Sequence, residues 1–113
     1  MKYMLLIYHD ERRWGEMSEA ERQQIYGEYG KLRDELKSAG QFLDGSQLGS
    51  SREAKSIKAR TGKELVTDGP FAETHEQLGG YFLIDTPSLD DAIAVAKRIP
   101  SVRMGTIEVR PLA

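Results

Sequence analysis

The chain has 113 residues, a net charge of −2 from 16 basic and 18 acidic side chains, and no cysteine. This length suffices for one domain with its own hydrophobic core, and the lack of cysteine excludes disulfides, thiolate nucleophiles and cysteine-ligated metal sites. The nearly balanced charge gives no general attraction to nucleic acid or to an anionic membrane. We therefore predict a single domain, residues 1–113, that binds neither.

The first segment with a clear pattern is an apolar run over residues 2–8, which turns polar at His9. It is much shorter than the ~20 residues that a transmembrane helix needs, and no small-residue cleavage site follows it. We interpret it as a central β-strand of a cytoplasmic protein, because a nearly continuous apolar run is typical of a strand covered on both faces.

A long helix is predicted between Ser18 and Gly40. Ser18 and Glu21 have the spacing of a capping box, and Gly40 suits the left-handed position just past a helix end. The apolar side chains recur at intervals of three and four residues and so form one stripe. They are Ile25, Tyr29, Leu32, Leu36 and Ala39.

Further along, the pattern predicts a strand over 42–48 and a hairpin whose strands are 54–60 and 65–67, joined by a turn at 61–63. Gly79 and Gly80 enter another apolar strand, 81–84, as a bulge or turn. A second helix begins at the N-cap Ser88 and ends before Pro100. Its apolar face comprises Leu89, Ala92, Ile93, Ala96 and Ile99, and a last strand covers 106–110.

The predicted order of elements is β, α, β, β-hairpin, β, α, β. This order predicts an α+β fold with a ferredoxin-like split βαβ sheet and an extra β-hairpin. Two helices on one face leave the other sheet face open. Because an open apolar face usually packs against a second copy, we predict a homodimer.

Charge is unevenly distributed around the hairpin. Residues 52–63 carry five basic side chains and one acidic one, whereas residues 64–96 carry seven acidic side chains and no basic one. Either the basic strand attracts an anion beside an acidic loop, or the two surfaces neutralise each other within the fold or across a dimer.

Residues 66–81 contain the segment Asp68-Gly69-Pro70-Phe71 and end at Gly79-Gly80-Tyr81. This stretch resembles the signature of the DGPF branch of the YCII-related proteins, and the resemblance extends to residues 1–8, 88–92 and 105–111. It implies a ferredoxin-like domain that pairs into a dimeric α/β barrel. Some relatives are encoded beside extracytoplasmic-function sigma factors, and distant ones include a muconolactone dehalogenase.

The chain departs from the family pattern at two positions, and a third residue, His9, lies where the family varies. YCII-type relatives have a proposed active site made of a His–Asp pair, and the position of its helical histidine is Tyr29 in this chain. His75 stands where the family more often has lysine, and His9 falls in a variable loop. Either histidine could act as a general base if it were held beside a substrate proton; otherwise each is a solvated surface group.

Two interpretations of Asp68 stay open. Its carboxylate could cap the turn formed by Gly69 and Pro70, or it could act as a general acid or base at the mouth of a cleft. Phe71 is interpreted as a core anchor for the loop, with a stacking platform as the alternative. Glu73 and Glu76 could share a face and bind a hard cation, or they are solvated charges.

We predict a small-molecule-binding domain, or a cofactor-free acid/base enzyme of lyase, isomerase or dehalogenase type, with no metal. Its pocket is expected between sheet and helices. The expected catalytic residues are Asp68 and His75, and the expected ligand-binding residues are Tyr29, Phe71 and Tyr81. The alternatives are a non-enzymatic regulatory or partner-binding module, linked to a sigma factor, and a purely structural dimer.

Overall fold

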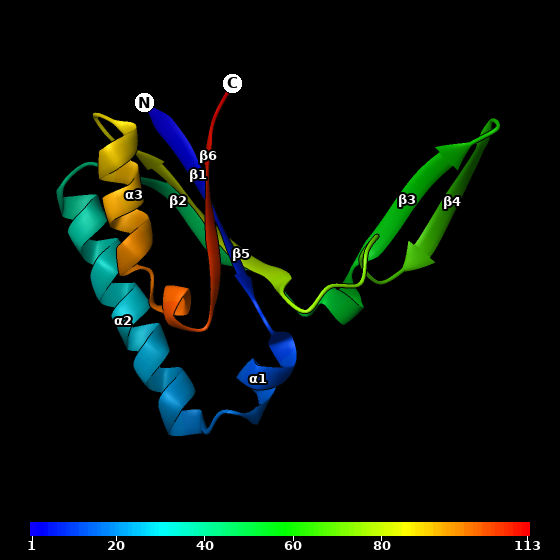
Figure 1. Cartoon of the computed structure of the whole chain (residues 1–113), viewed down its shortest axis with the longest axis horizontal. Coiled ribbons are helices and arrows are strands. Elements are labelled where there is room, and N and C mark those ends of the chain that lie inside the picture. The colour runs from blue at the N-terminus through cyan, green and yellow to red at the C-terminus, as the bar shows by residue number, and fades with distance from the viewer.

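The computed structural model describes residues 1–113 and shows an antiparallel sheet, helices on one of its faces and a separate hairpin (Figure 1). The sheet has the order β2-β5-β1-β6, and the hairpin pairs β3 with β4. The strands are β1 (Lys2–His9), β2 (Phe42–Gln47), β3 (Lys55–Arg60), β4 (Lys63–Asp68), β5 (Gln77–Asp85) and β6 (Gly105–Pro111). The helices are α1 (Glu11–Glu16), α2 (Glu19–Ser38) and α3 (Leu89–Arg98), with 3₁₀ turns at Ser51–Glu53 and Pro100–Arg103.

The connectivity is that of a ferredoxin-like fold. Strands β1 and β5 are central and antiparallel, and each βαβ unit places its second strand beyond a neighbour. The predicted fold class, with its extra hairpin, is confirmed. No helix of the chain is both long and apolar enough to cross a bilayer.

The two long helices begin and end where their capping signals predicted. Ser18 and Glu21 form the complete capping box of α2, and Gly40 follows that helix with a φ of 71°. Ser88 accepts a hydrogen bond from the backbone N–H of Asp91 at the start of α3. Helix α1 was not predicted, since its six residues carry no apolar stripe. Asp10 caps its start, because the Asp10 carboxylate accepts a hydrogen bond from the backbone N–H of Arg12.

The core lies between the sheet and helices α2 and α3. It is an eleven-residue cluster in which alternate residues of β1 and β5 meet the helices. The predicted apolar faces were wrong at two positions, because Ala39 and Leu89 are exposed at helix ends. Val95, which was not predicted, is buried instead. The cluster comprises Tyr3, Leu5, Ile7, Leu32, Leu36, Phe82, Ile84, Ala92, Val95, Ala96 and Ile99.

The hairpin β3–β4 projects away from the rest of the domain as an arm, residues 55–68 (Figure 1). Its strands pair only with each other, and the chain measures 48 × 39 × 18 Å. The radius of gyration is 15.9 Å, whereas a compact chain of this length has about 13 Å. The difference follows from the arm.

The alternation along β5 gives a direct test of which sheet face holds the core. Ile84 is fully buried, and its neighbour Leu83 is only half-buried on the opposite face. We expect Ile84→Ala to lower the free energy of unfolding by roughly 2–5 kcal/mol, and Leu83→Ala to lower it by less than half as much. Urea unfolding of the single chain, at a concentration too low for self-association, measures both. Equal losses would contradict packing of the core on one face.

Candidate functional site

His9 is the last residue of β1, so the expectation of a loop position was wrong. Its ring stacks on Trp14 of α1, with centroids 5.9 Å apart and planes inclined by 17°. Trp14 in turn meets the ring of Tyr26 on α2 edge-on, at 5.5 Å. These two aromatic contacts connect the end of β1 to both helices and restrict the position of the imidazole.

The His9 ring lies against the backbone of Gly79, which is a bulge residue of β5. The pairing shifts there, because Ile7 pairs with Gly80 and Tyr8 pairs with Leu78. A Cβ atom on Gly79 would stand 2.4 Å from Cε1 of His9, so the residue must be glycine for this ring position. The predicted bulge at Gly79-Gly80 is confirmed, and it makes room for the imidazole.

Burial makes His9 a neutral imidazole near pH 7. Desolvation lowers its pKa below the ordinary value of 6.5, and the nearby carboxylates of Glu11, Asp10 and Glu76 oppose this shift. No hydrogen bond to either ring nitrogen fixes a tautomer. A neutral imidazole can accept a proton from a bound molecule.

An inner cavity of about 150 Å³ lies between α2 and the helix-covered face of the sheet. Its walls are mainly aromatic or without side chains, and no aspartate or glutamate lines it. The Tyr29 hydroxyl shares a hydrogen bond of 2.6 Å with Ser101 Oγ, and burial raises the pKa of Tyr29. The lining residues are Ile7, His9, Trp14, Tyr26, Tyr29, Arg33, Ser46, Gln47, Gly79, Gly80, Phe82 and Ser101.

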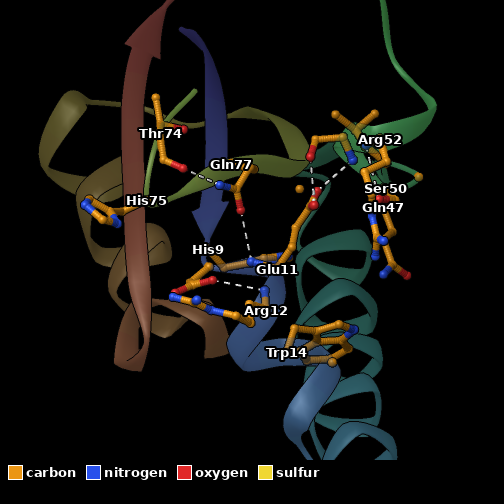
Figure 2. Close-up of a pocket in the computed structure, with 16 residues that line it drawn as sticks. His9, Glu11, Arg12, Trp14, Gln47, Ser50, Arg52, Thr74, His75 and Gln77 are labelled. Carbon is orange, nitrogen blue, oxygen red and sulfur yellow. Dashed lines mark hydrogen bonds between the residues drawn. The ribbon is translucent and has the colours of Figure 1, made fainter. Parts of the chain in front are cut away.

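An outer cavity of about 1000 Å³ lies beside α1 and the segment that leads into the arm (Figure 2). Glu11 holds its two sides together: its carboxylate accepts bonds of 2.8 Å from the N–H and the hydroxyl of Ser51, and its N–H donates to Gln77 Oε1 at 3.0 Å. Arg12, Arg52 and His75 also line it. This cavity is polar and open.

The two cavities share four lining residues: His9, Trp14, Gln47 and Gly79. The stacked rings of His9 and Trp14 therefore stand at the junction of the outer and inner cavities. The imidazole of His9 is thus among the groups that both cavities have in common. This is the best candidate in the chain for a binding or reaction site.

The structure distributes the predicted site residues over four places. Tyr29 lines the inner cavity, and His75 lines the outer one, where its ring stands apart from His9 (Figure 2). Tyr81 points to the open sheet face and donates a bond of 3.0 Å to Asp44. Asp68 and Phe71 line neither cavity, so the five residues do not share one pocket. The roles predicted for them stay predictions.

The segment Asp68-Gly69-Pro70-Phe71 lies at the base of the arm. Asp68 ends β4, and its carboxylate forms an ion pair with Lys55 across the hairpin rather than capping the turn. Gly69 has a φ of 87°, which only glycine adopts easily. The interpretation of Phe71 as a core anchor was wrong, because its side chain is 81% exposed in the single chain.

Sequence reasoning missed Trp14, Gln47 and Arg33 as lining residues. Trp14 is the single tryptophan, and it sits five positions after His9 in a polar segment without strand or helix periodicity. The only local sign of a helix in that segment is Asp10, a residue type that often caps a helix N-terminus. Arg33 lies one turn after Tyr29 on α2 and therefore on the same side of the helix. The prediction that Tyr29 binds a ligand could have been extended to Arg33 for this reason.

Comparisons with known proteins agree along the whole chain. The model of the YCII-related domain matches residues 1–113. An uncharacterised protein of Rhizobium meliloti (strain 1021) is 35% identical over 115 residues, which cover all of this chain and 93% of the relative. The similarity therefore includes the sheet, the helices and the arm.

The lowered pKa of His9 predicts how stability changes with pH. Below about pH 6.5 the unfolded chain binds a proton at His9 that the folded chain does not, so folding stability decreases as the pH falls through this range. His9→Gln is expected to remove this part of the decrease. Thermal unfolding at about pH 7.5 and about pH 5.5 measures it.

The other histidine gives the matched control for this experiment. His75 is exposed, and His75→Gln should keep the same loss of stability between the two pH values as the unchanged protein. If His9→Gln also keeps it in full, the imidazole of His9 is not desolvated in solution.

Proposed function

The chain belongs to the YCII-related family, and on that premise we propose that it is a small-molecule-binding domain whose ligand lies beside His9, in the inner cavity. The observation that carries the proposal is the position of a partly buried, neutral imidazole at the junction of the two cavities. The cavities have the usual character of ligand sites, since they are concave and combine aromatic walls with a few polar groups.

The chemistry that this arrangement supports is proton transfer without a cofactor. A ring nitrogen of His9 would take a proton from the bound molecule and become imidazolium. Return of the proton to another atom of the molecule would complete an isomerisation, and departure of a leaving group would complete an elimination. Lyase, isomerase and dehalogenase-like reactions all fit this scheme. His75 lines only the outer cavity, so in this scheme it would contact the molecule before binding and not during proton transfer.

Within the family, the stretch 66–81 supports a place in the DGPF branch. We propose that its aspartate and glycine set the base of the arm, through the Lys55–Asp68 ion pair and the left-handed Gly69. A catalytic role for Asp68 would require a second element to cover it, since its carboxylate is exposed.

A homodimer is proposed on the open face of the sheet. The half-buried apolar side chains Met4, Leu6 and Leu83 alternate with the core residues and so point away from the helices. Tyr8 and Tyr81 flank them, hydrogen-bonded to Glu108 and Asp44. An apolar centre with a polar rim is typical of a surface that pairs with a second copy.

The exposed apolar side chains of the arm also support a homodimer. Ile57 and Val66 are cross-strand partners, yet they are 66% and 63% exposed. An isolated two-stranded hairpin is only marginally stable in water. We propose that the arm lies on the second copy, where its excess of basic side chains meets acidic residues. A different protein on the arm is the alternative, and it would make the chain a regulatory module.

The proposed function is tested by a screen of small molecules, with binding followed by NMR. We expect bound molecules to shift the amide signals of His9, Gly79 and Gly80. Any reaction found with such a ligand should slow at least 100-fold in His9→Gln, since general-base catalysis contributes about 10²–10⁴-fold. Ligands that shift only residues of the arm would contradict the proposal.

The homodimer is tested by light scattering after size-exclusion chromatography. We expect the protein to elute at twice the mass of one chain, and Leu6→Arg to elute as a monomer because it places a charge at the centre of the open face. Ile57 lies on the exposed arm, outside the core. Ile57→Lys should therefore weaken association but leave the melting temperature of the single chain unchanged.

The matched control for association is Gln24→Arg, on the exposed side of α2. It should remain dimeric. A monomer for the unchanged protein at micromolar concentration would refute the homodimer, and a dimer that survives both substitutions would refute the two surfaces assigned to it.

A further inference from the structure

Arg33 is the single charged side chain that lines the inner cavity. We propose that the cavity selects a flat, one-ring molecule bearing one carboxylate, and that the guanidinium of Arg33 binds this carboxylate. The inference rests on the proposed function, because it assigns a ligand class to the same cavity. It depends on the charge, the walls and the size of the cavity.

The charge of Arg33 has no partner within the protein. It takes part in none of the six ion pairs of the chain, and its side chain donates no hydrogen bond to another residue. The residues three and four positions away on α2 are Tyr29, Gly30, Leu36 and Lys37, so no carboxylate lies beside it on the helix. The other arginines near the ends of α2 and α3 differ, since Arg22, Arg98 and Arg103 are each paired with a glutamate.

The side chain of Arg33 is also partly buried, and so it is partly removed from water. A guanidinium presents its N–H donors in a planar fork that matches a carboxylate with two parallel hydrogen bonds. No acidic residue lines the inner cavity, so an anionic group bound in it has no carboxylate among the residues around it. The charge pattern therefore favours an anion over a cation.

The walls favour a flat apolar body for the rest of the molecule. Tyr29 and Phe82 meet edge-on at 6.0 Å on one part of the wall, and Trp14 and Tyr26 meet edge-on at 5.5 Å on another. Gly79 and Gly80 leave bare backbone on the sheet side. A Cβ on Gly80 would come within 2.9 Å of the Ser46 carbonyl oxygen, so this part of the sheet has no room for a side chain.

The size of the cavity limits the molecule to one ring. A volume of about 150 Å³ corresponds to a cavity that holds a benzene-sized molecule. Arg33 comes from α2 and His9 from β1, so the carboxylate and the ring would be held by different elements. The imidazole would then face the molecule from the side of the outer cavity.

The experiment compares benzoate with its neutral analogue benzamide, which has the same ring and nearly the same shape. Each is titrated into the full chain, and binding is followed by the amide signals of residues around the inner cavity. Benzoate is expected to bind more tightly than benzamide. Arg33→Gln is expected to weaken benzoate about tenfold to 100-fold, the loss of a charge-assisted pair of hydrogen bonds, and to leave benzamide unchanged.

Two further variants separate charge from geometry and from general effects of substitution. Arg33→Lys keeps the charge without the planar fork, so it should retain only part of the affinity for benzoate. Lys31→Gln removes a charge from the exposed side of the same helix and should change neither ligand. Melting curves establish that each variant is folded.

The outcomes are distinct. If benzamide binds as well as benzoate, or Arg33→Gln leaves the benzoate affinity unchanged, the carboxylate assignment is overturned while the proposed cavity function stands. In that case the arginine only covers apolar surface and keeps its charge in water. If neither molecule shifts the cavity signals, the one-ring assignment is overturned, and the screen of other small molecules tests the cavity function separately.

Discussion

The ring of His9 occupies space that any side chain on Gly79 would fill. A Cβ at that position would stand 2.4 Å from the imidazole, and the bulge in β5 places the glycine opposite the end of β1. Trp14 can stack on His9 only when the imidazole has this position, and that stack brings α1 against the sheet. His9, Trp14 and Gly79 line both cavities. The geometry of the candidate site therefore requires glycine at position 79.

The segment that resembles the DGPF signature and the candidate site are formed by different residues of the chain. Residues Asp68 to Phe71 lie at the base of the arm and line neither cavity, whereas the cavities lie between α1, α2, β2 and β5. The segment 72–77 connects the two, since Thr74 and Gln77 line the outer cavity. This short segment is therefore the covalent link between residues 68–71 and the outer cavity.

Sequence reasoning predicted the parts of the fold that have local signals. The capping box at Ser18, the glycine at position 40 and the proline at position 100 each satisfy or end a helix without help from distant residues. The alternating strands and the turn of the hairpin are local in the same sense. Together with the order of elements these signals were sufficient for the ferredoxin-like topology.

The candidate site was less predictable because it depends on tertiary contacts. His9 and Trp14 are close in sequence, but their stack forms only because a short helix turns back at Asp10. Tyr29 was expected in a pocket between sheet and helices and does line one. The prediction for Phe71 was wrong because a large aromatic residue predicts burial, yet Phe71 follows the arm directly and is largely exposed.

The most direct measurement of the central claim is a crystal structure of the protein with a bound ligand. If the site is the pair of cavities that meet at His9, the ligand will lie against His9 and Trp14, with part of it over Gly79 and Gly80. A ligand bound against Asp68 and Phe71 instead, with the cavities at His9 filled only by water, would contradict it.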